Sequence, residues 1–404
     1  FWGPGDTPIS FSSSTRQPPR RPGILQGSRL FHQTLSDYLG TMGYRAAAAD
    51  QCLFLKPDPE FTAVLTWVDD FIFIHKEEQT WTAFIQNLRK RFVVPTVGDL
   101  TCFLGMSITY DPAQRSMSMS QTHTIKTLLE RASMMDCNPV ITPCVPGMVW
   151  TNRDCPSTDE ASNSTQYRGL VALANFIANW TRPDITYTVN KLCKYMAKPG
   201  AVHWQALKHL LRYLKGSEHV GLYFNFDTPV AGLHGYTDAS HADCTDTGKS
   251  TVGYIFFYGR AALSWYSKLH TYVTTCTNHS EYAALALGAK EAQWMVYLFN
   301  ELEPLCTHVP VPLFVDNSGV IALVFNPIDH QANKHIRLAC HFARELTEEK
   351  LIAPQRVPSA NNLADVFTKA LGGTLFKELV QNFIRQSKAP MVTSVRGGVL
   401  DSVQ

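Results

Sequence analysis

Six acidic residues stand at positions where they could do chemistry. Asp69 and Asp70 are adjacent and lie between two apolar, strand-forming runs in LTWVDDFIFI, residues 65–74. Only these two acids separate the runs, so the sequence predicts a tight hairpin turn that presents both carboxylates. Like charges in such a setting are costly, so the pair needs compensating partners elsewhere in the chain.

The other four acids fall at the ends of expected elements in the C-terminal third. Asp238 ends a strand in GYTD, and Asp316 ends another in LFVD. Glu281 is expected in the first turn of a long helix, and Asp365 in the first turn of the last helix. Carboxyl ends of strands and helix N-termini are the places where α/β domains assemble their sites.

Each of these four acids also has a plain structural explanation. Glu281 and Asp365 could complement a helix N-terminus, which contributes roughly 0.3–1 kcal/mol, and Asp316 could cap a turn. Clustered together, however, two carboxylates ~4 Å apart repel by about 4 kcal/mol at an effective dielectric of ~20. Such a cluster would need Mg²⁺ or Mn²⁺. A pair of these ions suits in-line attack on a phosphodiester.

Periodicity predicts the elements that position these acids. Residues 30–43, 79–92 and 121–133 follow helical spacing, and strands are expected around 51–56, 61–68, 71–76 and in a hairpin over 100–120. From residue 231 the pattern is strand, strand, strand, helix, strand, helix, which predicts an α/β layered domain on a mixed sheet.

The middle of the chain is expected to be a linker followed by helices. Prolines and polar clusters over 138–165 predict the linker, and 165–216 is mostly helical with a break at Pro183. Lys208, Arg212 and Lys215 share one helix face. That face is either an ordinary solvated surface or a stripe that contacts phosphates.

Composition sets broad limits. With 404 residues, 45% of them hydrophobic, the chain is globular and long enough for two or three domains. A net charge of +2 does not by itself indicate a nucleic-acid partner. The sequence contains no C-x-x-C pair and no apolar run of about 18 residues, so free thiols and no membrane span are expected. Residues 1–29 are rich in Ser, Pro and Gly and are expected to be disordered, and the non-Met start suggests a piece of a longer protein.

Motifs carried in order over residues 231–372 resemble the RNase H domain of copia-type retrotransposon Pol polyproteins. They are YTDASHAD, KSTVGYIFF, LSWYSK, SEYAAL, FVDNSGVI, KHIRLACHF and NNLADVFTKAL. The resemblance implies that Asp238, Glu281, Asp316 and Asp365 are catalytic acids that bind Mg²⁺ or Mn²⁺. It also implies hydrolysis of the RNA strand of RNA–DNA hybrids. Asp243 and Asp246 are left out of this set.

Upstream segments resemble the second half of the reverse transcriptase of the same family. They include LFHQTLSDYLGTMGYRAAAADQCLF, TWVDD and GDLTCFLGMSI, with a connecting region in HWQALKHLLRYLKG. By this resemblance Asp69 and Asp70 are metal-binding acids of the polymerase palm, with Trp67 where the family has Tyr. Polymerase chemistry needs another aspartate from an upstream segment, so the polymerase half is expected to be incomplete in this chain.

The resemblance implies a multidomain α+β and α/β protein. The expected parts are a partial reverse-transcriptase palm at 30–145, a linker and helical connection at 146–230, the RNase H-like mixed-sheet domain at 231–372 and a C-terminal tail at 373–404. Expected partners are an RNA–DNA hybrid, an RNA template with a DNA primer, and the missing N-terminal part of Pol with its integrase and fingers. The expected location is cytoplasmic, in particles, or nuclear. The alternative is a catalytically inactive, nucleic-acid-binding remnant of a transposable element.

Overall fold

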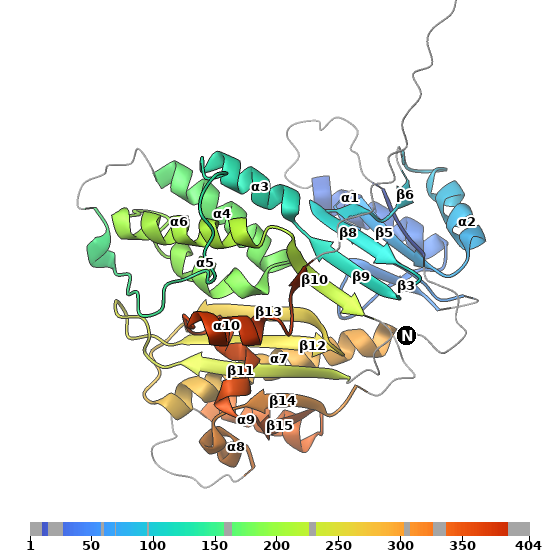
Figure 1. The fold of residues 1–404 in the computed structure, drawn as a ribbon. Helices are drawn as coiled ribbons and strands as arrows, with labels where there is room; N and C mark the ends of the chain where they lie inside the picture. Colours follow the sequence, from blue (N-terminus) through green and yellow to red (C-terminus); the bar gives the residue numbers. More distant parts are fainter. Residues whose placement is uncertain are drawn as a thin grey trace, which may run out of the picture.

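The computed structural model describes residues 10–14, 27–57, 60–68, 70–94, 97–156, 164–225, 232–302, 308–325 and 337–386. Within these residues the chain forms three β-sheets and a group of helices. In Figure 1 the helical group lies at the upper left, the first two sheets at the upper right, and the third sheet in the lower half. The mixed α/β class expected from the sequence is confirmed.

The first sheet is antiparallel and has the strand order β2-β3-β4-β5-β1-β6. Its strands are β1 (Ser10–Ser14), β2 (Arg45–Ala46), β3 (Leu53–Lys56), β4 (Thr62–Trp67), β5 (Asp70–His75) and β6 (Gly98–Asp99). Helices α1 (Gly27–Thr41) and α2 (Glu78–Leu88) bury their apolar stripes on it. Phe73 of β5 and Phe84 of α2 stack with ring centroids 4.2 Å apart. The β4–β5 hairpin forms where the sequence predicted it, but Asp70 lies in β5 opposite Trp67 rather than in the turn, and Asp69 lies outside the described residues.

Part of the N-terminal segment was wrongly expected to be disordered. Residues 10–14 form β1, which pairs with β5 along its whole length and with β6 at the other edge. The sequence SFSSS has little apolar content to suggest a strand. Main-chain hydrogen bonds to the open edge of β5 hold it in place, and they do not depend on side chains.

The second sheet has the order β16-β10-β9-β8-β7 and joins segments far apart in the chain. Its strands are β7 (Cys102–Phe103), β8 (Met106–Asp111), β9 (Ser116–Ser120), β10 (Val220–Asn225) and β16 (Arg385–Gln386). The β8–β9 hairpin confirms the prediction for 100–120, whereas β10 lies where only linker and helices were expected. Because β10 pairs with β9, the helical group is tied to the reverse-transcriptase-like part.

The helical group confirms the mostly helical prediction for 165–216. It contains α3 (Thr122–Arg131), α4 (Ser164–Trp180), α5 (Thr186–Cys193) and α6 (Ala201–Gly216), with a short 3₁₀ helix η3 (Pro183–Ile185) between α4 and α5. Pro183 occupies the first position of η3, so the break falls where it was predicted. The described residues of the expected linker are packed: Trp150 is buried, and the amide of Val140 donates to the carbonyl of Arg212.

The third sheet has the order β13-β12-β11-β14-β15, with β11 to β13 antiparallel and β14 and β15 parallel to β11. Its strands are β11 (Leu233–Ser240), β12 (Thr251–Tyr258), β13 (Ala261–Leu269), β14 (Val311–Val315) and β15 (Ile352–Arg356). The associated helices are α7 (Thr277–Leu302), α8 (Ser318–Phe325) and α9 (Arg337–Glu348). A Cβ on Gly288 of α7 would lie 2.5 Å from Thr237 Cγ2, so glycine lets this helix approach β11 closely.

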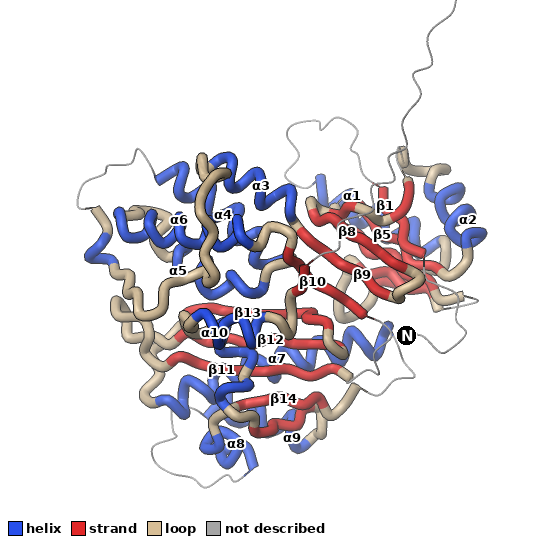
Figure 2. The backbone as a smooth tube through the Cα atoms, viewed as in Figure 1, coloured by secondary structure: helices blue, strands red, loops and turns tan. Residues whose placement is uncertain are grey.

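The expected C-terminal tail is also partly structured. Helix α10 (Gly373–Val380) and strand β16 follow residue 372, and α10 lies in front of the third sheet in Figure 2. Phe376, Leu379 and Val380 are buried in the core shared with the helical group, because their helical spacing forms an apolar stripe. The structure therefore describes part of the expected tail, up to residue 386.

Helix α7 links the first and third sheets. Glu301 accepts hydrogen bonds from the amides of Ala48 and Ala49, each at 2.9 Å, and Leu298 and Leu302 pack on the first sheet. Among the described helices, none combines the length and apolar character that crossing a bilayer requires.

Candidate metal centre

Strand register brings two of the predicted acids together. β11 and β14 run parallel with Gly235 opposite Leu313 and Tyr236 opposite Phe314. Two residues further on, the same register sets Asp238 level with Asp316 and, by strand alternation, on the same face. Asp238 is fully buried and Asp316 is half-buried.

Asp365 reaches the same place through a short 3₁₀ helix, η6 (Leu363–Phe367). Asn362 caps η6 by accepting from the amide of Ala364, and it donates to the carbonyl of Thr237 at 3.1 Å. A Cβ at Gly253, the residue opposite Asp238 on β12, would lie 2.7 Å from Phe367 Cβ. Glycine there lets η6 lie against the sheet. The ligand oxygens of Asp238, Asp316 and Asp365 all fall within 4.8 Å of one another.

The placement of Asp365 differs in one respect from the expectation. The segment NNLADVFTKAL forms η6 rather than the start of the last α-helix, which is α10, eight residues further on. Asn362 is the N-cap of η6 and is hydrogen-bonded to Thr237 of β11, so it determines where η6 begins.

Glu281 lies beside this trio. Helix α7 begins at Thr277, so Glu281 stands in its second turn and not, as expected, in the first. Its side chain is buried, the amide of Ala239 donates to it, and Oε2 has no hydrogen-bond partner among the described residues. An unpartnered buried carboxylate oxygen is costly unless a proton or a cation satisfies it.

Two residues of this site escaped the sequence reasoning. Lys369 Nζ lies 3.0 Å from Asp365 Oδ1 and 3.3 Å from Asp238 Oδ2, and Thr368 Oγ1 donates to Asp238 Oδ2. The signal for Lys369 was its i, i+4 spacing from Asp365. Lys369 acts as an internal counter-ion for the buried acids.

The crowding of acids shifts their pKa values. Burial, followed by the charges of Asp238 and Asp316, raises the pKa of Glu281 to about 9. Burial and the charge of Asp238 raise the pKa of Asp365 to about 7, although Lys369 opposes this. Burial alone would lower the pKa of Lys369, but the charges of Asp238 and Asp365 outweigh it and raise that pKa.

These shifts predict how the stability of the metal-free protein depends on pH. Both acids have folded-state pKa values above their unfolded values of 4.5 and 3.8, so the stability that their neutral forms contribute is present at low pH. It is lost as the pH rises through about 7 for Asp365 and about 9 for Glu281. The Tm measured in EDTA should therefore fall between pH 5 and pH 9 by the contribution of these two groups, and Glu281→Gln should flatten the upper part of that fall. A Tm slope that Glu281→Gln leaves unchanged would contradict the assignment.

Removing Lys369 should strengthen metal binding. Its ammonium competes with a cation for Asp238 and Asp365, so Lys369→Met is expected to raise the affinity for Mn²⁺ about tenfold at neutral pH. The metal-free variant should be less stable, because the acids lose their counter-ion. Isothermal titration calorimetry measures the first effect and thermal unfolding the second. Lys377→Met, at an exposed position on α10, is the matched control and should change neither.

The donor set fits a hard divalent cation. Carboxylate oxygens are the ligands that Mg²⁺ and Mn²⁺ prefer. The site offers three carboxylates with converging oxygens and, beside them, a fourth buried carboxylate with an unpartnered oxygen. Asp238, Asp316 and Asp365 would hold the ion, and Glu281 lies close enough for its pKa to respond to two of them.

The other predicted acids lie apart from this centre. Asp70 begins β5, is half-buried and pairs with Trp67, whereas Asp69 lies outside the described residues. Trp67 meets Trp180 at the end of α4 edge to face, with centroids 5.8 Å apart. Within the described part of the chain, Asp70 belongs to no group of three potential metal ligands. The roles of Asp69 and Asp70 in a polymerase stay predictions.

The predicted basic stripe on α6 is partly engaged within the protein. Arg212 Nε donates to the carbonyl of Asn138 at 2.7 Å, and Lys215 lies 4.0 Å from Glu218, while Lys208 is exposed. Arg212 thus helps to hold the 138–156 segment on α6. Contact of the three residues with nucleic acid stays a prediction.

Comparisons with known proteins agree with this arrangement. The family described as "Reverse transcriptase (RNA-dependent DNA polymerase)" matches residues 21–146. The Pol polyprotein of transposon RE2 from Arabidopsis thaliana is 34% identical over 94% of this chain, and that of transposon TNT 1-94 from Nicotiana tabacum is 30% identical over 89%. These matches cover 25% and 27% of the relatives, so the chain spans about a quarter of their length.

One solved structure is similar to part of this chain. RNase H1 from Halobacterium salinarum is 20% identical, with 34% of this chain and 95% of that chain covered, at a TM-score of 0.27.

A reverse-transcriptase-like region joined to a mixed sheet that gathers carboxylates defines a nucleic-acid-processing protein of retroelement type. The chain belongs to the copia-type retrotransposon Pol polyprotein family.

Proposed function

We propose that residues 231–372 hydrolyse the RNA strand of RNA–DNA hybrids with the help of Mg²⁺ or Mn²⁺. The observation that carries this proposal is the convergence of Asp238, Asp316 and Asp365 within 4.8 Å, beside Glu281. Their burial and raised pKa values mark a site arranged for a cation rather than a set of surface acids.

The acids of the site have different proposed roles, which follow from their positions. Asp238 is central, since it contacts Thr368 and Lys369 and lies level with Asp316. Glu281 holds a proton in the metal-free protein at neutral pH and would release it when a cation binds. Two divalent cations, when bound, would activate the attacking water and stabilise the leaving oxygen of the phosphodiester.

Lys369 has a second role in this proposal. When a cation replaces it beside Asp238 and Asp365, its ammonium becomes available to the phosphates of the hybrid. Its side chain is 38% exposed, so a substrate can reach it. Selection of a hybrid over a DNA duplex would depend on contacts with 2′-hydroxyl groups in the minor groove.

The experiment is a cleavage assay on a hybrid whose RNA strand is labelled. We expect Mg²⁺-dependent products with 5′-phosphate and 3′-hydroxyl ends, and no cleavage in EDTA or of the matching DNA duplex. Hybrid binding without any metal-dependent product would instead support the inactive, nucleic-acid-binding alternative.

A role for the reverse-transcriptase-like region follows from its attachment. Through α7 and β10 it is fixed to the nuclease domain, so we propose that it helps to hold the hybrid near the carboxylates.

A further inference from the structure

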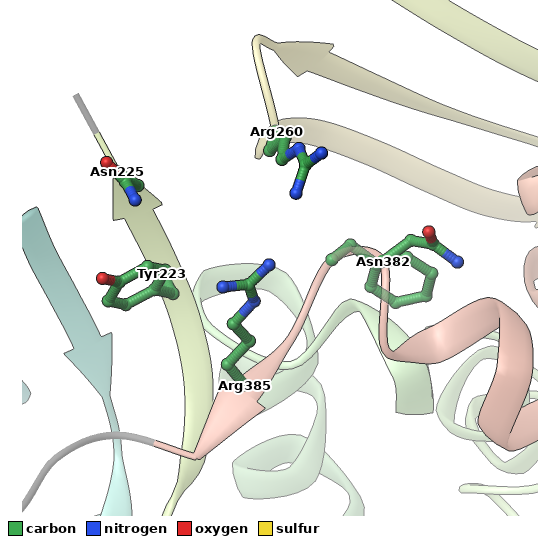
Figure 3. Close-up of a pocket in the computed structure, with 6 residues that line it drawn as sticks. Tyr223, Asn225, Arg260, Asn382 and Arg385 are labelled. Carbon is green, nitrogen blue, oxygen red and sulfur yellow. The ribbon is translucent and has the colours of Figure 1, made fainter. Parts of the chain in front are cut away.

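A small cavity lies where β10, the β12–β13 turn and the segment after α10 meet. It has a volume of about 30 Å³ and is lined by Tyr223, Asn225, Arg260, Asn382, Phe383 and Arg385. Figure 3 shows the guanidinium groups of Arg260 and Arg385 directed toward each other across it. No part of this cavity belongs to the metal centre described above.

Two permanent positive charges face this cavity. Arginine stays protonated in proteins, and neither guanidinium forms an ion pair with a carboxylate among the described residues. Like charges that converge in this way repel unless an anion lies between them. The arrangement would therefore suit an anion.

The walls hold one of these arginines in position. The guanidinium carbon of Arg385 lies 5.3 Å from the ring centre of Tyr223, a cation–π contact that leaves the nitrogen edge of the fork free to donate. Asn382 Nδ2 donates to the carbonyls of Glu378 and Leu379, which fixes the opposite wall to the end of α10.

The size of the cavity selects the ligand. A volume of about 30 Å³ has room for a tetrahedral oxyanion but not for a nucleobase or a drug-sized molecule, whose sites need roughly 300 Å³ or more. The guanidinium forks match phosphate oxygens. Arg260, Arg385, Asn225 and Asn382 are all exposed, so the cavity opens at the surface. A phosphodiester whose sugar and base stay outside meets all of these conditions.

We propose that Arg260 and Arg385 together bind one backbone phosphate of a nucleic-acid duplex, at a point remote from the metal centre. The end of β12 is Tyr258, five residues beyond Gly253, which pairs with Asp238, so roughly 17 Å of strand separates them. The choice of an RNA–DNA hybrid as the duplex rests on the proposed function, but the binding itself requires no cleavage.

The test measures hybrid binding in EDTA, so that it does not depend on nuclease activity. Fluorescence anisotropy with a labelled RNA–DNA hybrid, over about 50–200 mM salt, should show about tenfold weaker binding for Arg260→Gln and for Arg385→Gln at the low end. Because the two arginines share one phosphate, the double variant should lose about 0.9 from the slope of log K against log salt, and each single variant, which keeps one arginine there, should lose less. Arg89→Gln, at an exposed position after α2, is the matched control and should keep the wild-type affinity and slope.

Arg385→Lys separates the effect of the positive charge from the effect of the guanidinium geometry. It keeps the positive charge and the aliphatic stem against Tyr223, so it should retain the salt slope while losing the fork geometry and some affinity. Unchanged affinity and slope in the folded double variant would overturn the proposal.

Titration with inorganic phosphate tests whether the cavity binds the free ion instead of a backbone phosphate. If phosphate raises the Tm of the wild type but not of the double variant, while both bind the hybrid equally, the cavity takes the free ion and the proposal is wrong. If the wild-type protein does not cut the hybrid but the arginine variants show the predicted loss of slope, the phosphate site is supported and only the proposed nuclease activity is refuted.

Discussion

Asp238→Asn is expected to reduce Mg²⁺-dependent cleavage of the RNA strand by roughly 10³-fold or more. Asp238 is the fully buried acid of the cluster, lies level with Asp316 and contacts Lys369 and Thr368. An amide has nearly the same shape but carries no charge, so it could not hold a divalent cation between its neighbours. The rate of hybrid cleavage under single-turnover conditions measures the loss.

Stability separates loss of chemistry from loss of fold in this variant. Removing one of several crowded negative charges should lower the raised pKa values of Glu281 and Asp365 toward their ordinary range. The metal-free variant should therefore unfold at a Tm no lower than that of the wild type near pH 8. Undiminished cleavage by Asp238→Asn would contradict the assigned role.

Asp246→Asn is the matched control for this experiment. Asp246 is near Asp238 in sequence, but it accepts hydrogen bonds from the amide of Asn152 and the hydroxyl of Tyr195. An asparagine oxygen can still accept one of these bonds. This variant should cleave at close to the wild-type rate.

Arg182→Met is expected to destabilise the folded protein by about 3–5 kcal/mol, the largest effect on stability that the structure predicts. Arg182 and Asp184 are almost wholly buried and form a two-point ion pair at 2.9 and 2.7 Å. Arg182 also donates to the carbonyl of Ser217, and Tyr213 donates to Asp184 at 2.6 Å. The network joins η3 to the end of α6, and removing Arg182 leaves a buried carboxylate without its cation.

Urea unfolding monitored by circular dichroism measures this loss. Arg131→Met, at an exposed position on α3, is the control and should change stability by less than about 0.5 kcal/mol. The triple variant Arg182→Met, Asp184→Leu and Tyr213→Phe should recover part of the lost stability, because this network then contains no buried charge. A loss below about 1 kcal/mol in Arg182→Met would show that the network contributes little.

The sequence predicted the acids of the site better than their surroundings. Asp238 and Asp316 follow apolar strands, and strand ends are visible in a single sequence as changes of pattern. Their adjacency depends on the parallel pairing of β11 with β14, whose paired residues are 78 positions apart, and no local pattern encodes that register. Only the resemblance to a known family supplied it.

The misses have physical causes. β1 and β10 are held by main-chain hydrogen bonds to distant strands, so their own sequences carry weak signals. Lys369 was overlooked because a lysine after a short helix resembles a surface residue, and its role depends on Asp238, which is 131 positions away. Arg260 and Arg385 likewise become a pair only through the fold.

The most direct test of the central claim is a crystal structure grown with Mn²⁺ and measured at the manganese absorption edge. The account predicts an anomalous peak about 2.1 Å from oxygens of Asp238, Asp316 and Asp365, with Lys369 moved away from Asp365. A cluster that binds no manganese, with Lys369 still 3.0 Å from Asp365 as in the metal-free protein, would contradict it.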